Sequence, residues 1–178
     1  MQIFPLSLDA TWQQVESPQL CHDTFPASLH DWLTEPCSLT AKLKSHCRHF
    51  AVEVLNEQLA LAPHALGWAD GFSQQSMWCR EVLLWCDGKP VVYGQSWIPQ
   101  TLLTMTKLGN TPLGEVLFQE PRWTRKGIEI ATLNGPLKPL LLRLALEVRQ
   151  KYARRSVFEQ GQQQMLVCEV FLTETPCR

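Results

Sequence analysis

The clearest hydrophobic pattern in the chain is a pair of apolar, β-rich runs between Trp78 and Pro99. The turn sequence Cys86-Asp87-Gly88-Lys89 separates them, and Asp-Gly is a strong hairpin signal because both positions tolerate a positive φ. The first run is apolar on both of its alternating faces, which predicts a central strand covered on both sides. Arg80 and Glu81 stand out at its start, because a buried charge is rare unless it has a partner.

Apolar residues at helical spacing predict two short helices before this hairpin. The first spans Pro26 to Thr34, and Pro36 follows to stop it. Ser38 can cap the second, which carries Leu39 and Leu43 on one face.

Two further helices are expected after the hairpin. Thr111-Pro112-Leu113 reads as a helix start, because threonine is a good N-cap and proline is a favoured first helical residue. Leu137 to Tyr152 is strongly apolar with a basic trailing end, and it predicts a long helix.

The remaining β-rich segments are Phe50 to Leu55, Thr124 to Ala131, Ser156 to Phe158 and Met165 to Leu172, with a polar turn over Glu159 to Gln164. Strands therefore outnumber crossover helices and pair mainly through hairpins. This order predicts an α+β fold with an antiparallel sheet. A chain of 178 residues fits one domain over 1–178, in which 1–25 is the least defined part.

Charge and composition limit the possible partners. The formal net charge is -1, which gives no general attraction to nucleic acid or to anionic lipid, so an anionic ligand needs local groups to hold it. No run reaches the roughly 18 apolar residues of a membrane span. Met1 to Thr11 has no basic residue and does not read as a signal peptide.

The seven cysteines are scattered and form no Cys-x-x-Cys pair, which favours reduced, mostly buried thiols in a cytoplasmic protein. His46 and His49 could share a helix face with Cys47 nearby. No third and fourth ligand has a spacing that would join them, so we expect no metal site.

Three segments together resemble the chorismate–pyruvate lyase family. The first runs from Trp78 to Leu84 and continues through Asp87-Gly88-Lys89-Pro90 to Ile98-Pro99. The second is Lys107-Leu108-Gly109-Asn110-Thr111-Pro112-Leu113-Gly114, followed by Leu117-Phe118. The third comprises Ile128-Glu129-Ile130, Arg154-Arg155-Ser156 and Cys168-Glu169-Val170-Phe171-Leu172. Their order and spacing are similar to the family's from about residue 26 onward.

The resemblance implies a cytoplasmic enzyme that splits chorismate into 4-hydroxybenzoate and pyruvate, on the way to ubiquinone, without a metal or organic cofactor. It also implies a six-stranded antiparallel sheet with packed helices, and a buried site under helical flaps, which we assign to Ser38–Cys47 and Lys107–Leu117. The chain departs from the family at Leu39, where methionine is common, and in a longer insert between Ile130 and Arg154. We expect a monomer.

The resemblance assigns ligand contacts to Arg80, Glu169, the backbone of Leu39 and the N–H of Leu113. Arginine suits a carboxylate clamp because its planar fork makes two parallel bonds. The amide of Leu113, near a helix start, has no partner within the helix and suits an anion. Glu169 lies in an apolar strand, where it could act as a base or orient the ring hydroxyl.

Each charged candidate also has a structural interpretation. Arg80 could form an ion pair with Glu81 or another carboxylate, and Glu169 could pair with Arg80 or Arg155. The alternative function is a sensing domain for small anions, because effector domains of some bacterial repressors resemble the same fold. Those domains follow a basic winged helix-turn-helix of about 70 residues, and the segment before Trp78 does not fit one.

Overall fold

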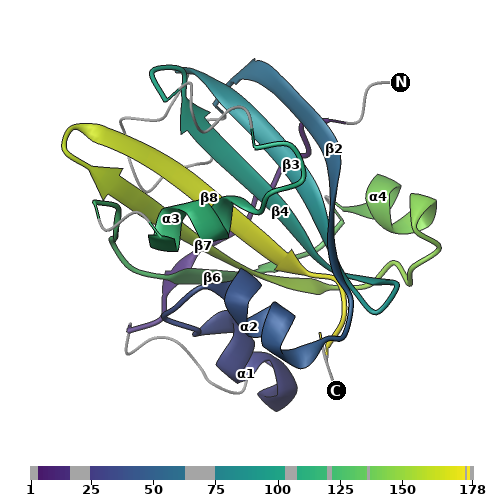
Figure 1. The fold of residues 1–178 in the computed structure, drawn as a ribbon. Coiled ribbons are helices and arrows are strands. Elements are labelled where there is room, and N and C mark those ends of the chain that lie inside the picture. The colour runs from purple at the N-terminus through teal and green to yellow at the C-terminus, as the bar shows by residue number, and fades with distance from the viewer. Residues whose placement is uncertain are drawn as a thin grey trace.

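The computed structural model describes residues 4–16, 25–62, 75–102, 108–119, 122–135, 137–174 and 176. Eight strands form one antiparallel sheet in the order β1-β6-β7-β8-β4-β3-β2, and β5 pairs with β7 (Figure 1). The strands are β1 (Gln13–Gln14), β2 (Phe50–Leu61), β3 (Ser76–Cys86), β4 (Lys89–Pro99), β5 (Thr124–Arg125), β6 (Glu129–Leu133), β7 (Lys151–Gln160) and β8 (Gln163–Phe171). The predicted α+β class is confirmed.

The strand count exceeds the expected six because two strands, β1 and β5, contribute only two residues each. The other six have five residues or more. The expected strand from Thr124 to Ala131 is divided where Gly127 has a φ of 136°. Its two parts, β5 and β6, both pair with β7, with a one-residue shift of register between them.

The β3–β4 hairpin forms as predicted. Asp87 and Gly88 have φ angles of 49° and 77°, which suit a two-residue turn between strands. The Asp87 carboxylate also accepts the N–H groups of Arg48 and His49 at 3.0 and 2.9 Å. This turn therefore holds the chain that enters β2.

The first three helices lie close to their predicted positions: α1 (Ala27–Leu33), α2 (Leu39–His46) and α3 (Leu113–Gln119). The Ser38 hydroxyl caps α2 by accepting the N–H of Ala41 at 3.2 Å. Helix α3 begins at Leu113, so Pro112 stands just before it. None of the helices that the structure describes could cross a membrane.

The long helix expected over Leu137 to Tyr152 is wrong. Only α4 (Lys138–Arg143) is helical, and it ends where Ala145 takes a left-handed φ of 53°. The apolar run belongs to two elements, because the chain from Lys151 onward enters the sheet as β7, between β6 and β8. Hydrophobicity alone cannot separate a buried helix from a buried strand.

The sheet has two covered faces. One packs against the N-terminal segment and α4, through a core that includes Leu6, Leu140 and Trp97. The other lies under α1 and α2, whose Leu33 and Leu43 are buried against Val92 and Phe171. In Figure 1, α3 crosses in front of β8 and β7 on this second face.

Three cysteines, Cys79, Cys86 and Cys168, are buried, as expected for thiols that pack as small hydrophobes. Burial raises the pKa of Cys168 to about 12, so this thiol stays protonated and unreactive. Cys47 is half-buried and Cys37 is exposed, while Cys21 and Cys177 lie outside the described residues.

Glu81 on β3 is fully buried and fastens the N-terminal segment to the first face. Its carboxylate accepts the N–H of Leu6 and the amide of Asn56, both at 2.8 Å, and the amide of Gln95 at 3.3 Å. The Tyr93 hydroxyl also donates to it. Burial and the nearby carboxylate raise the pKa of Tyr93 well above its usual value, so the hydroxyl remains a donor.

Replacing Glu81 with alanine should lower the free energy of unfolding by about 3–5 kcal/mol, because several buried donors lose their acceptor at once. Glu53→Ala is the matched control on the neighbouring strand, because the carboxylate of Glu53 is exposed and accepts from the Trp85 indole at 3.1 Å. That change should cost less than about 1 kcal/mol. Urea unfolding followed by tryptophan fluorescence measures both, and equal losses would contradict the assigned role of Glu81.

Candidate active site

A small, partly covered cavity lies on the face of the sheet that α2 and α3 cover. Its volume is about 40 Å³, far below the roughly 300–1,000 Å³ of common ligand pockets. A ligand can therefore enter only if the covering segments move. Three strands and both helices or their ends contribute its lining: Thr40, Arg80, Val82, Leu84, Gly94, Ser96, Pro112, Leu113, Gly114, Val167 and Glu169.

Three of the four residues singled out in the sequence line this one cavity. Arg80 comes from β3, Leu113 from the start of α3, and Glu169 from β8. Leu39 is buried at the start of α2 but is not among the lining residues, whereas its neighbour Thr40 is. Residues 89 positions apart thus meet because β4 lies between β3 and β8 in the sheet.

The Arg80 side chain is only 2% exposed and holds the chain that leads into α3. Its Nη2 donates to the carbonyls of Gly109 and Thr111 at 2.6 and 3.2 Å. Its Nη1 lies 3.4 Å from Oε1 of Glu57, the residue opposite it on β2. Arg80 has a carboxylate partner, but it is not Glu81, because neighbouring residues of a strand point to opposite faces.

Glu169 forms a tight ion pair with Arg154, from Nε to Oε2 at 2.6 Å. The two residues are direct partners across β7 and β8. The sequence analysis named Arg80 or Arg155 as the possible partner of Glu169, and both predictions are wrong. Arg155 points to the other face, where its Nε lies 2.6 Å from Oε2 of Glu129.

Two arginines beside the cavity were not recognised as site candidates. Arg154 is 1% exposed. Arg125 lies over the rings of Phe118 and Phe158, each 5.0 Å away. Burial and the neighbouring Arg154 cation lower the pKa of Arg125 to about 10, so it is still charged at neutral pH. The sequence signal for Arg154 is its place in the family-like segment Arg154-Arg155-Ser156, where the adjacent Arg155 is an equal candidate.

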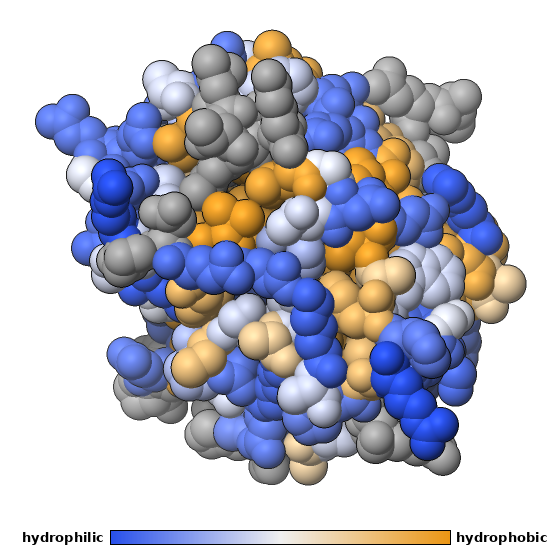
Figure 2. Space-filling view, viewed as in Figure 1, coloured by the Kyte–Doolittle hydropathy of each residue, from blue (hydrophilic) through white to orange (hydrophobic). Residues whose placement is uncertain are grey.

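Helices α2 and α3 meet above the cavity and form its cover. A Cβ on Gly114 would lie 3.1 Å from Oγ1 of Thr40, so a glycine allows this close approach. Lys44 and Glu115 form an ion pair between the same two helices. Figure 2 shows apolar side chains gathered in the central part of this face of the molecule. Helix α2 lies within the expected flap Ser38–Cys47, and α3 overlaps the expected flap Lys107–Leu117, of which Lys107 lies outside the described residues.

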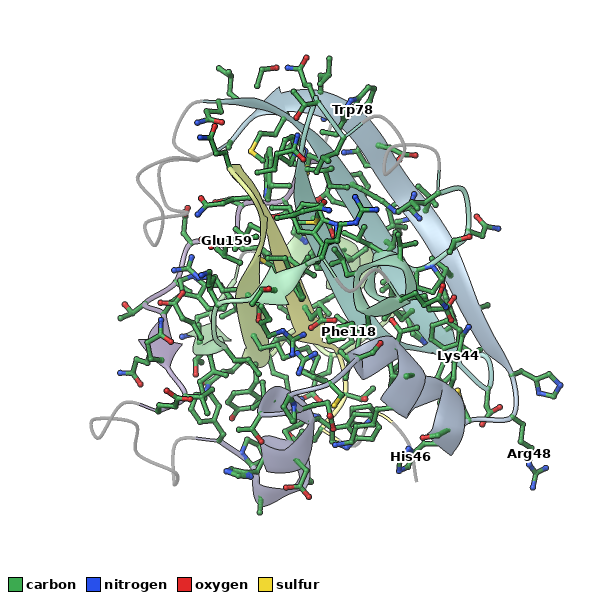
Figure 3. The ribbon with its side chains drawn as sticks, turned by 60° about the vertical axis from the view of Figure 1, so that its left-hand side comes forward. Lys44, His46, Arg48, Trp78, Phe118 and Glu159 are labelled. Carbon is green, nitrogen blue, oxygen red and sulfur yellow. The ribbon has the colours of Figure 1, made fainter. Side chains whose placement is uncertain are left out.

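A larger hollow lies elsewhere, in an open depression lined by His46, Arg48, His49, Asp87 and Gly88. Its histidines do not share a helix face, because α2 ends at His46. In Figure 3, Arg48 points away from the molecule. No three metal-binding side chains gather anywhere in the described part of the chain. An exposed, polar depression gives a ligand little to bury against, so the cavity lined by buried side chains is the better candidate site.

Several solved structures with a similar fold are domains of bacterial regulators. The effector domain of PhnF from Mycobacterium smegmatis matches with a TM-score of 0.58 at 14% identity, over 76% of this chain and 88% of that one. The C-terminal domain of the histidine utilization repressor from Pseudomonas syringae matches with a TM-score of 0.57 at 12% identity, over 73% and 95%. At these identities the likeness concerns the fold alone.

Sequence relatives are much closer. A protein of Pseudoalteromonas translucida, named probable chorismate pyruvate-lyase, is 43% identical over 97% of both chains. Proteins with the same name from Aromatoleum aromaticum and Shewanella frigidimarina are 40% and 38% identical, over 83% and 88% of this chain and 85% and 86% of theirs. The family described as chorismate lyase matches residues 6–176. By the extent of these sequence matches, the chain belongs to the chorismate lyase family.

Proposed function

We propose that this protein is an enzyme that splits chorismate into 4-hydroxybenzoate and pyruvate. The observation that carries the proposal is the meeting of Arg80, Leu113 and Glu169 in one small cavity, in a chain of this family. Chorismate is a dianion with a ring carboxylate, an enolpyruvyl ether and a neighbouring hydroxyl. Its cleavage needs a cation for the ring carboxylate, a polar group at the hydroxyl end and a dry pocket.

Arg80 and the Leu113 amide hold the ring carboxylate in this proposal. A guanidinium has five N–H donors, and the three bonds that Arg80 makes to Gly109, Thr111 and Glu57 leave capacity for a ligand. As the first residue of α3, Leu113 has an N–H without an acceptor inside the helix. The backbone of Leu39 contributes from α2, next to Thr40, which lines the cavity.

Glu169 acts at the opposite end of the ligand. The reaction breaks the bond between the ring and the ether oxygen and removes the hydrogen from the carbon that bears the hydroxyl. In one route Glu169 accepts this hydrogen as a proton. In the other it orients the hydroxyl while the hydrogen moves to the enolpyruvyl methylene in a concerted shift. Aromatisation of the ring drives either route, and neither needs an electron sink.

The wider assignment follows the family. We propose a cytoplasmic monomer without a metal or organic cofactor, with no nucleic-acid partner, whose product enters ubiquinone synthesis. The net charge of -1 is consistent with a ligand held by local groups.

Incubation of the purified protein with chorismate tests the function. We expect 4-hydroxybenzoate, followed by its absorbance, and pyruvate in equal amounts. Binding of chorismate without turnover would instead favour the sensing alternative, which shares the fold of the regulator domains.

Replacing Arg80 with alanine should weaken 4-hydroxybenzoate binding about ten- to a hundredfold, by loss of a charge-assisted pair of about 1.5–3 kcal/mol. Uncharged 4-hydroxybenzamide serves as the control ligand, because it lacks the charge that Arg80 would hold. Its affinity should change much less, and titration calorimetry measures both. Equal weakening for the two ligands would make Arg80 a purely structural residue.

Product release, not chemistry, should limit turnover. The groups that hold the ring carboxylate of chorismate also hold that of 4-hydroxybenzoate, and the small cavity keeps the product enclosed until the cover opens. Rapid mixing should show a burst of close to one 4-hydroxybenzoate per site, followed by a slower steady rate. A linear time course with weak product inhibition would show that chemistry limits.

A further inference from the structure

Arg154 connects Glu169 to the segment that carries the cover. While Nε binds the Glu169 carboxylate, Nη1 donates to the carbonyls of Trp32 and Glu35 at 3.3 and 2.8 Å. Trp32 lies near the end of α1, and Glu35 lies in the short connection to α2. One guanidinium thus fixes both the acidic group of the cavity and the approach to one of its covering helices.

The third nitrogen of Arg154, Nη2, is buried and has no hydrogen-bond partner among the described residues. Nε and Nη2 share one edge of the planar guanidinium, so this N–H lies on the side that faces Glu169. Leaving a buried charged donor unsatisfied is costly, and native proteins rarely do so without a reason. A ligand acceptor that binds beside Glu169 would give Nη2 its missing hydrogen bond.

The chemistry of the proposed substrate provides such an acceptor. Chorismate carries a second carboxylate on the enolpyruvyl group, attached to the ring carbon next to the hydroxyl that Glu169 faces. Bringing this anion close to the Glu169 carboxylate is unfavourable unless a cation offsets the repulsion. Arg154 provides that cation, and Arg125 adds a second positive charge nearby.

We propose that Arg154 is the binding site for the second carboxylate of chorismate, the one that leaves with pyruvate, and that it positions Glu169 at the same time. The inference rests on the proposed function. It predicts that Arg154 distinguishes substrate from product, because 4-hydroxybenzoate keeps the ring carboxylate but has lost the second one.

The structure offers a matched pair of variants, Arg154→Lys and Arg155→Lys. Both arginines lie on β7, both are at most 4% exposed, and each forms a 2.6 Å ion pair through Nε. They point to opposite faces of the sheet. Lysine keeps the charge but cannot reproduce the planar fork, so both variants should lose similar stability.

In Arg154→Lys, the single-turnover rate at subsaturating chorismate should fall about ten- to a hundredfold, as expected for loss of charge-assisted bonds. Affinity for 4-hydroxybenzoate should change by less than about threefold, which corresponds to less free energy than one charge-assisted bond contributes. Arg155→Lys should change neither quantity. Equal losses for substrate and product, or equal effects of the two variants, would overturn the assignment. Turnover by the parent protein distinguishes failure of the proposed function from failure of the Arg154 assignment, because an inactive parent refutes the proposed function itself.

A measurement on the parent decides the question even if Arg154→Lys does not fold. The probe is 4-hydroxybenzoate with a 1-carboxyethyl ether on the carbon next to the hydroxyl, a stable aromatic ligand with both carboxylates. It should bind at least about tenfold more tightly than 4-hydroxybenzoate, the gain from one charge-assisted pair. Equal or weaker binding of this probe would refute a second carboxylate site at Arg154.

Discussion

The alternating direction of side chains along β3 and β7 places charged residues that hold the fold together on one face of the sheet and those of the candidate site on the other. Neighbouring residues of a strand point to opposite faces of the sheet. On β3, Glu81 therefore fastens the N-terminal segment on one face, while Arg80 points into the cavity on the other. The same division recurs on β7, where Arg155 pairs with Glu129 away from the cavity and Arg154 pairs with Glu169 beside it.

This arrangement leaves buried charge on both faces of the sheet, and on the cavity face that charge lies beside an apolar core. An isolated buried charge is strongly unfavourable, and removal of one member of a buried pair is costly. Arg80 and Arg154 meet this requirement in the same way, because each combines one carboxylate with two backbone carbonyls of a covering segment. The charges that would bind a ligand are thus the ones that hold the cover in place. In the proposed function, binding of a ligand is therefore coupled to movement of the cover.

Local signals made part of the structure predictable. The Asp87-Gly88 turn and the Ser38 cap each depend on a few adjacent residues, and both form as expected. The prediction of a helix over 137–152 was wrong because a run of apolar residues is compatible both with a buried helix and with a buried strand. The neighbours of β7, which decide the matter, come from distant parts of the chain.

The site was predictable only in part for a related reason. Arg80 and Glu169 were identifiable as charges within apolar strands, supported by the family resemblance. The partner of Glu169 depends on the register between β7 and β8, which the two-residue turn at Gly161 sets. A shift of one residue would place Arg155 opposite Glu169 instead. The register between β7 and β8 cannot be read from the composition or residue spacing of either strand alone.

The central claim is that the ligand lies inside the sheet-facing cavity under α2 and α3. A crystal structure of the protein with 4-hydroxybenzoate tests it most directly. We expect the carboxylate between the Arg80 guanidinium and the Leu113 N–H, the hydroxyl at Glu169, and the cavity enlarged well beyond its present 40 Å³ by displacement of the cover. A ligand seated in the open depression beside His46 and Asp87, with the cavity still closed, would contradict the account.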